Sequence, residues 1–213
     1  MNAPENFWIQ PNVKCWHLKS SSSDDPYLPS TITQKIGEKI NLRTTTGELI
    51  TNVIFPSVFQ RGDNPDLIDD MVDIEFLNEA ELLNNLKRRF IEKNIIFTYV
   101  GPTLLIINPY KYIDELFNVN TMALYQKQIN NSSFTLKDLP PHIFGISADL
   151  FKNIFLNQKN QALVISGESG AGKTENTKYA MKFLTSLGFN NFWSIFINLV
   201  KRKHHGMQGF GCS

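Results

Sequence analysis

The chain is poor in cysteine, nearly balanced in charge and free of long apolar runs. Its 213 residues include two cysteines, Cys15 and Cys212, which form no metal-ligand pattern, so we expect free thiols in a reducing cytosol. The formal net charge of +1 gives no reason to expect a nucleic-acid partner. No apolar run approaches the roughly 20 residues that cross a bilayer, and the first residues do not resemble a signal peptide. We therefore expect a cytoplasmic protein without a membrane span.

The most informative stretch that is present is Gly167-Glu168-Ser169-Gly170-Ala171-Gly172-Lys173-Thr174, which fits the phosphate-loop pattern G-x-x-x-x-G-K-[ST]. Glycines at these positions let successive backbone N–H groups curl around a polyphosphate without a Cβ in the way. Lys173 would bring a positive charge to the β- and γ-phosphates, and the Thr174 hydroxyl would ligate Mg²⁺. The motif therefore predicts binding of a nucleoside triphosphate, with all of these residues as its phosphate contacts.

The segments on either side of this loop have the order that a phosphate loop needs. Residues 161–166 read as a short buried strand that runs into the loop. Apolar residues recur at helical spacing from Ala180 to Leu187, and Gly188 is a suitable helix stop. The sequence therefore predicts strand, loop and helix in succession.

The first sixty or so residues have the pattern of a small β module. Short strands are expected at residues 7–9, 13–18, 39–43 and 49–53, with the last two joined as a hairpin around Thr46-Gly47. A serine-rich loop spans 20–26, and Arg61 to Pro65 reads as a linker. Trp8 and Trp16 could form a ligand-binding pair, but we interpret them as core residues.

A helix is expected next, capped by Asn78 and with Glu81 completing a capping box. Leu83, Leu86 and Phe90 share one face, which predicts the buried side of this helix. The basic run Lys87-Arg88-Arg89 lies beside that face, and we interpret it as solvated rather than as a binding patch.

Two strands and a second helix follow. Residues 95–100 and 103–107 flank Gly101-Pro102, which predicts a pair of neighbouring strands. Pro140 to Phe144 introduces a helix for which Ser147 is the expected cap, with Leu150, Phe151, Ile154 and Phe155 on its inward face. His142 has no visible Ser, Cys or carboxylate partner, so we assign it a structural rather than a catalytic role.

Several separate blocks in this order resemble the N-terminal part of the myosin motor head. The blocks are Asp70 to Phe90, Ile96 to Gly101, Asn108-Pro109-Tyr110-Lys111, Pro141-His142-Ile143-Phe144 and Gly167 to Lys178. The initial β module is similar to the small SH3-like barrel that many myosins carry before the motor core. The resemblance implies an α/β fold, with an incomplete P-loop NTPase motor core preceded by an SH3-like β-barrel.

The resemblance also implies roles for individual residues. ATP and Mg²⁺ would be bound, with the loop on the phosphates and Thr174 on the metal. Asn108, Pro109, Tyr110 and Lys111 would form the wall around the base, and Glu175 and Asn176 would support the site. The family usually follows this wall with a Leu-Pro-x-Tyr whose tyrosine contacts adenine. Near that position only Phe117, one residue late, offers an aromatic ring.

We expect three segments: a β module at 1–64, the N-terminal part of a motor domain at 65–188, and an unrelated tail at 189–213. The two switch segments of the family are not found after residue 187. The tail has an apolar run and a basic end, which is typical of a short membrane-surface or partner-binding helix. We favour the alternative that it arises from translation through an intron or past a frameshift.

The favoured interpretation is the N-terminal portion of an actin-based motor that, in the complete protein, couples hydrolysis of Mg-ATP to movement along actin filaments. Actin filaments, light chains and a cytoskeletal location are implied for that complete protein. One alternative is a non-motor P-loop NTPase, and another is a truncated, non-catalytic nucleotide-binding fragment. No complete catalytic set is present, so we expect this chain alone to bind nucleotide weakly and neither to hydrolyse ATP nor to bind actin tightly.

Overall fold

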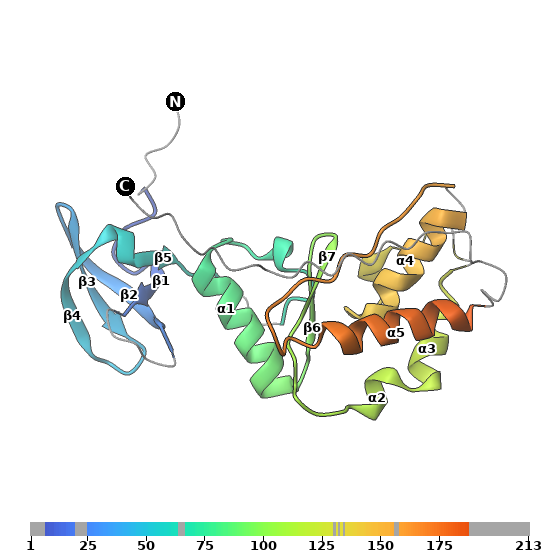
Figure 1. Cartoon of the computed structure of the whole chain (residues 1–213). Helices are drawn as coiled ribbons and strands as arrows, with labels where there is room; N and C mark the ends of the chain where they lie inside the picture. The colour runs from blue at the N-terminus through green and yellow to red at the C-terminus, as the bar shows by residue number, and fades with distance from the viewer. Residues whose placement is uncertain are drawn as a thin grey trace, which may run out of the picture. The chain divides into compact units, whose positions relative to one another are not determined.

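The computed structural model describes residues 7–19, 25–63, 67–129, 131, 133, 135–155 and 158–187. The chain divides into two compact units, Met1–Ile95 and Ile96–Ser213 (Figure 1). The first unit thus contains a helix in addition to the β module, and the three-segment division stays a prediction. Cys212, the expected helix stop at Gly188 and the expected tail lie outside the described residues.

The first unit is built on a five-stranded antiparallel sheet, which is consistent with an SH3-like β region. Its spatial order is β4-β3-β2-β1-β5. The strands are β1 (Lys14–Leu18), β2 (Tyr27–Ile36), β3 (Lys39–Thr44), β4 (Leu49–Ile54) and β5 (Val58–Gln60), with a 3₁₀ turn at Phe55–Ser57. The predicted β3–β4 hairpin is confirmed, and its turn includes Gly47 at φ +91°. Strand β2 was not expected from the sequence.

The core of this unit is formed mainly by side chains of the sheet, and Trp16 is also buried, at 7% exposed. Fully or nearly buried members are Ile9, Cys15, Ile32, Ile40, Leu42, Val53 and Val58, with Trp8 packed against them. The structural interpretation of Trp8 and Trp16 is therefore confirmed. Residues 7–9 are not a strand, and that prediction is wrong: the main-chain N–H of Asn12 donates to Ile32, so Ile9 enters the core from a turn. Burial raises the pKa of Cys15 to about 12, which makes this thiol unreactive.

Helix α1 (Glu79–Lys87) follows a 3₁₀ turn at Met71–Asp73 and continues as a π-helical turn at Arg88–Glu92. Asn78 is its cap, as predicted, and accepts from the main-chain N–H of Glu81 at 3.1 Å. The Glu81 carboxylate does not complete the capping box as expected. It accepts instead from Trp16 Nε1 at 2.9 Å and from the Gly62 N–H at 2.8 Å, and it thereby ties the helix to the β module.

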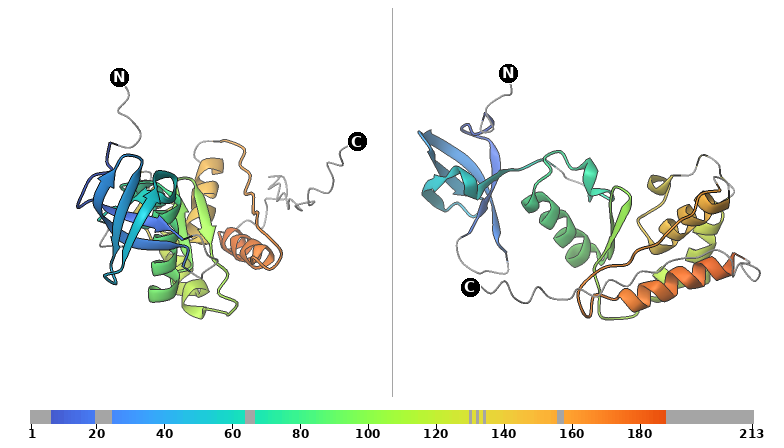
Figure 2. Two further views of the ribbon diagram at one scale, coloured as in Figure 1. Left: turned by 90° about the vertical axis from the view of Figure 1, so that its left-hand side faces the viewer. Right: turned by 45° about the horizontal axis from the view of Figure 1, so that its top comes forward.

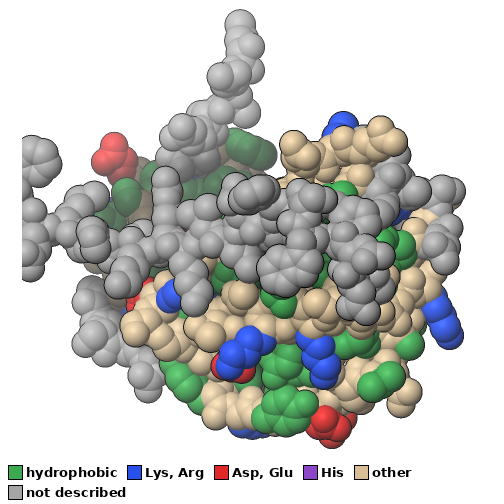
Figure 3. Space-filling model, turned by 45° about the vertical axis from the view of Figure 1, so that its right-hand side comes forward, with side chains coloured by type: hydrophobic (Ala, Val, Ile, Leu, Met, Phe, Trp, Pro, Cys, Tyr) green, Lys and Arg blue, Asp and Glu red, His purple; other side chains and the backbone are tan. Residues whose placement is uncertain are grey.

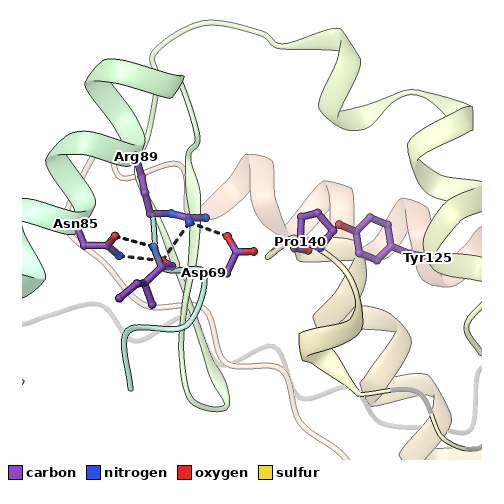
Figure 4. Close-up of polar contacts among 6 residues, drawn as sticks. Asp69, Asn85, Arg89, Tyr125 and Pro140 are labelled. Carbon is purple, nitrogen blue, oxygen red and sulfur yellow. Dashed lines mark hydrogen bonds and ion pairs between the residues drawn. The ribbon is translucent and has the colours of Figure 1, made fainter. Parts of the chain in front are cut away.

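The buried face of α1 and its continuation carries large polar side chains, which corrects two predictions (Figure 4). Asn85 and Arg89 are 6% and 1% exposed, whereas Leu83 is 42% exposed and Leu86 and Phe90 are only partly buried. The Asn85 amide exchanges two hydrogen bonds with the backbone of Ile68, and Arg89 Nη1 donates to the Ile68 carbonyl and to Asp69 Oδ1. The basic run is therefore not wholly solvated, because Arg89 satisfies backbone groups of a segment that lies along the helix.

The second unit begins with a hairpin of β6 (Phe97–Val100) and β7 (Thr103–Ile106), which confirms the predicted pair of strands. Gly101, at φ +58°, lies in its turn. Helices α2 (Asp114–Phe117), α3 (Val119–Gln126), α4 (Ile143–Phe155) and α5 (Lys173–Ser186) follow, with a 3₁₀ turn at Leu136–Asp138. Helices α4 and α5 pack side by side (Figure 2).

An aromatic core holds this unit together. Phe144 and Phe183 are completely buried, and their rings stack at 5.1 Å between α4 and α5. Tyr125 of α3 donates its hydroxyl to the Pro140 carbonyl at 2.8 Å (Figure 4). His142 is 2% exposed and accepts from the main-chain N–H of Phe144 at 3.0 Å. The histidine is thus a packed core residue at the start of α4.

The start of α4 differs from the prediction. The helix begins at Ile143, and Ser147 lies one turn inside it. The Ser147 hydroxyl donates to the Ile143 carbonyl at 2.9 Å, so it bonds within the helix and does not cap it. Leu150 is buried as expected, while Phe151 and Ile154 are only partly so.

Residues 161–166 do not form a strand, so that prediction is wrong for the part of the chain the structure describes. A strand requires a neighbouring backbone, and among the described residues β7 pairs with β6 and nothing pairs with 161–166. Val164 in this segment is 58% exposed. Figure 3 shows one face of the molecule on which hydrophobic side chains reach the surface beside Lys and Arg. The α/β core with a phosphate-loop strand stays a prediction.

None of the helices within the described ranges is both long enough and apolar enough to cross a membrane.

Candidate functional site

The predicted phosphate loop is a curled segment that ends at the first residue of α5. Gly170 and Gly172 have φ values of +80° and +88°, which side chains with a Cβ rarely adopt. A Cβ at Gly167 would lie 3.0 Å from the Cβ of Ala171, and a Cβ at Gly172 would lie 3.3 Å from Asn176 Nδ2. These positions of the loop therefore have conformations or close contacts that glycine accepts and that another residue would have to change.

Lys173 lies over this loop although it belongs to α5. Its Nζ donates to the Gly167 carbonyl at 2.8 Å and to the Glu168 carbonyl at 2.7 Å. The ammonium group is thus held beside the main chain of the loop, next to the N-terminus of a 14-residue helix whose free N–H groups favour anions. Thr174, the next residue, is exposed.

A second predicted motif contacts the loop directly. Asn108 Nδ2 donates to the Gly170 carbonyl at 2.6 Å across a sequence separation of 62 residues. The same amide accepts from the main-chain N–H of Tyr110 at 2.9 Å, and Tyr110 has the left-handed φ of +50°. Asn108 therefore fixes both the loop and the turn that carries Tyr110.

The two motifs border one pocket of about 360 Å³. Its lining consists of Ile96, Ile106, Asn108, Pro109, Tyr110, Lys111, Tyr112, Phe117, Gly172, Glu175, Asn176 and Tyr179. It thus brings together the whole Asn108–Lys111 wall with Glu175 and Asn176. Gly167, Ala171 and Lys173 border a separate groove that also contains residues 161–166.

The aromatic side of the pocket differs from the expectation that Phe117 offers the ring. Phe117 is only 6% exposed, and the Tyr179 ring covers it at 3.6 Å between centroids and 9° between planes. Tyr112 and Tyr179 also line the pocket, and the sequence analysis did not select either. Tyr179 could have been found, because it lies four residues after Glu175 and so shares a face of α5 with it.

Both of these phenols are neutral near pH 7. Desolvation raises the pKa of Tyr112, and the hydrogen bond that its hydroxyl donates to Asp114 at 3.2 Å acts in the same direction. Partial burial raises the pKa of Tyr179, and the nearby Glu175 carboxylate adds to this effect. Lys111 and Glu175 therefore supply the charges of the pocket lining.

Among the residues that the structure describes, no group of three or more His, Cys, Asp or Glu side chains could hold a metal ion. The donors of the loop are main-chain N–H groups, one ammonium (Lys173) and two hydroxyls (Ser169 and Thr174). Such a donor set suits a polyphosphate whose metal ion is held mainly by the phosphates.

Sequence comparisons identify related proteins. The myosin head (motor domain) family matches residues 68–194. Unconventional myosin-VI of Mus musculus is 36% identical over 148 residues, which cover 70% of this chain and 11% of that protein. Unconventional myosin-Vb of Homo sapiens is 38% identical over 128 residues (59% of this chain, 6% of that protein).

A plant relative gives longer coverage. Myosin-5 of Arabidopsis thaliana is 33% identical over 169 residues, which cover 78% of this chain and 10% of that protein. The chain thus spans about a tenth or less of the length of these curated relatives. The family match includes the phosphate loop, the Asn108–Lys111 wall and the pocket that both motifs border. The chain belongs to the myosin head (motor domain) family.

Proposed function

We propose that this chain is the N-terminal, ATP-binding portion of an actin-based myosin motor. The observation that carries the proposal is the hydrogen bond from Asn108 to Gly170, which joins a phosphate loop to a pocket of suitable size for a base. Membership in the myosin head family supports it and argues against a non-motor P-loop NTPase.

The glycines of the loop support the proposed binding of a triphosphate. A Cβ at Gly167 or Gly172 would crowd Ala171 or Asn176, so glycines at these positions support the close backbone approach that a bound polyphosphate needs. Gly167 to Thr174 would wrap the phosphates, and Lys173 would exchange its carbonyl partners for phosphate oxygens. Thr174 would ligate Mg²⁺, which supplies neutralisation of phosphate charge when bound.

The base would lie in the adjoining pocket. Asn108, Pro109, Tyr110 and Lys111 form one side of this pocket, and Glu175 and Asn176 of α5 form another. The amide of Asn176, which is 9% exposed, donates to the Gly172 carbonyl at 3.0 Å and so stabilises the end of the loop. Phosphates and base would therefore be bound by two motifs that the hydrogen bond from Asn108 to Gly170 joins.

In the complete protein, hydrolysis of Mg-ATP would drive movement along actin filaments, with light chains bound elsewhere in the protein and a cytoplasmic, cytoskeletal location. Phosphoryl transfer also needs groups that position the attacking water and hold the metal from a second side. We expect the 213-residue chain alone to bind nucleotide weakly and not to turn it over. Steady ATP hydrolysis by this purified chain would contradict the second expectation.

Binding of a fluorescent ATP analogue tests the proposal. Lys173→Ala should weaken binding by about tenfold or more, because a charge-assisted contact to phosphate is lost. Lys182→Ala is the matched control, since Lys182 is an exposed lysine later on the same helix, and its affinity should equal that of the wild type. Equal affinity of Lys173→Ala and the wild type would contradict the use of this loop.

A further inference from the structure

Aromatic rings outside the Asn108–Lys111 wall also line the pocket. Tyr110 and Tyr112 are 84% and 65% exposed, and Tyr179 is partly exposed, whereas Phe117 is 6% exposed. All four rings line the same pocket of about 360 Å³. A planar ligand that enters it therefore meets tyrosine rings first.

Phe117 is held rigidly behind that surface. Tyr179 covers its ring at 3.6 Å and 9°. Phe97 and Phe144 meet it edge to face, at 6.1 Å and 79° and at 6.2 Å and 85° respectively. A ring that packs on so many neighbours has little surface left for a ligand, and it acts as a support for the rings around it.

Tyr112, in contrast to Phe117, has an exposed ring with few neighbours in contact. Its ring centroid lies 6.5 Å from that of Phe117 with 26° between the planes, a looser contact than the 3.6 Å stack of Tyr179 on Phe117. Its hydroxyl donates to Asp114, the first residue of α2, at 3.2 Å, which restrains the side chain and leaves the residue 65% exposed. Tyr112 also follows Lys111 directly in the chain. The ring is thus exposed, restrained and part of the pocket lining.

We propose that Tyr112, rather than Phe117, is the ring that stacks on the base of a bound nucleoside triphosphate. This rests on the proposed function. Tyr179 and Phe117 form the rigid backing, and Tyr112 supplies the exposed face. Stacking on an aromatic side chain accepts every base because each has a π-face, so a larger purine gains more contact than a pyrimidine.

The experiment compares two ligands of the full chain, ATP and inorganic tripolyphosphate, which share the phosphate chain but differ in the base. Their dissociation constants are measured for the wild type, Tyr112→Ala, Tyr112→Phe and Lys173→Ala. Phe7→Ala is the matched control, because Phe7 is an aromatic ring of similar exposure, 63%, in the first unit. Circular dichroism melting establishes that each variant is folded.

Tyr112→Ala should weaken ATP binding by roughly 5- to 100-fold, the range expected for loss of one base–aromatic stack, and should leave tripolyphosphate binding unchanged. Tyr112→Phe and Phe7→Ala should bind both ligands as the wild type does. Lys173→Ala should weaken both ligands.

Two results would overturn the assignment of Tyr112 while leaving the phosphate site in place. One is unchanged ATP affinity in a folded Tyr112→Ala variant, and the other is an equal loss for both ligands. A wild-type chain that binds neither ligand, or a Lys173→Ala variant that binds both normally, would overturn the proposed function and the assignment of Tyr112 with it.

Discussion

Asn108 Nδ2 donates to the carbonyl of Gly170 at 2.6 Å, and this bond joins the base-side wall to the phosphate loop. The other end of the same amide holds the Tyr110 N–H at 2.9 Å. The first bond is not visible in either motif alone, because its partners lie in segments 62 residues apart. One side chain therefore couples the shape of the loop to the shape of the pocket.

Replacing Asn108 should separate its two contacts. Asn108→Ala loses both bonds and should weaken binding of a fluorescent ATP analogue about tenfold, with a loss of about 1 kcal/mol in the free energy of unfolding. Asn108→Asp keeps the acceptor for Tyr110 but cannot donate to Gly170, and its charge repels phosphate, so we expect an equal or larger loss of affinity. Asn41→Ala, in the first unit, should bind normally. Normal binding by both Asn108 variants would contradict the coupling.

Gly145 of α4 should be intolerant of a side chain. A Cβ at this position would lie 2.8 Å from the Tyr99 hydroxyl oxygen, which is closer than real Cβ contacts. Tyr99 is 2% exposed, so the ring has little room to move. Gly145→Ala should lower the free energy of unfolding by about 1–3 kcal/mol, measured by urea denaturation.

The double variant identifies the cause of that loss. Removing the hydroxyl in Gly145→Ala/Tyr99→Phe should recover part of the stability, with Tyr99→Phe alone as the reference. A double variant whose loss equals the sum of the two single losses would show that the clash is not the reason.

His142 should make the protein less stable in mild acid. Burial lowers the pKa of His142 to about 4, with the Leu116 backbone acting weakly in the other direction, so the folded state binds this proton less readily than the unfolded chain. The free energy of unfolding is unaffected by this group above the unfolded pKa of 6.5. It falls as the pH drops from there toward 4, by up to about 3 kcal/mol. Urea midpoints measured between pH 4 and 7 test this slope.

The variant His142→Phe keeps a ring in the core but has no proton to bind, so it should flatten that slope. Burial also lowers the pKa of His17, so His17 likewise makes the protein less stable in acid. His17→Gln should remove only this contribution and leave the contribution of His142 to the slope unchanged. An unchanged slope in His142→Phe would assign the pH dependence to other groups.

Arg89 should matter far more than its neighbour Arg88. Arg89→Met leaves the Ile68 carbonyl and Asp69 without this donor in a site where the arginine side chain is 2% exposed, at an expected cost of about 2–4 kcal/mol. Arg88 is 28% exposed at the side chain and lies 3.9 Å from Glu92, so Arg88→Met should cost less than about 1 kcal/mol. Similar melting temperatures for the two variants would contradict the buried role of Arg89.

Local signals predicted the elements that depend on nearby residues. Turn residues predicted both hairpins, Asn78 predicted the start of α1, and the spacing of glycines and lysine predicted the loop before α5. The polar face of α1 was missed, because the burial of Glu81 depends on partners such as Gly62 in another segment.

The same reason explains what was missed in the candidate site. Tyr112 could not be selected from spacing alone, since its place in the pocket depends on Phe117 and on Tyr179 from another helix. Residues 161–166 have the composition of a strand, yet composition does not supply the neighbouring backbone that a strand needs.

Photolabelling with 8-azido-ATP tests most directly whether the two motifs form one nucleotide site. The light-activated group is carried on the base, so it reacts with residues that lie beside the base. We predict labelling that excess ATP prevents, in peptides that contain Asn108 to Tyr112 or Tyr179. Labelling that ATP does not prevent, or ATP-sensitive labelling confined to the first unit, would contradict the account.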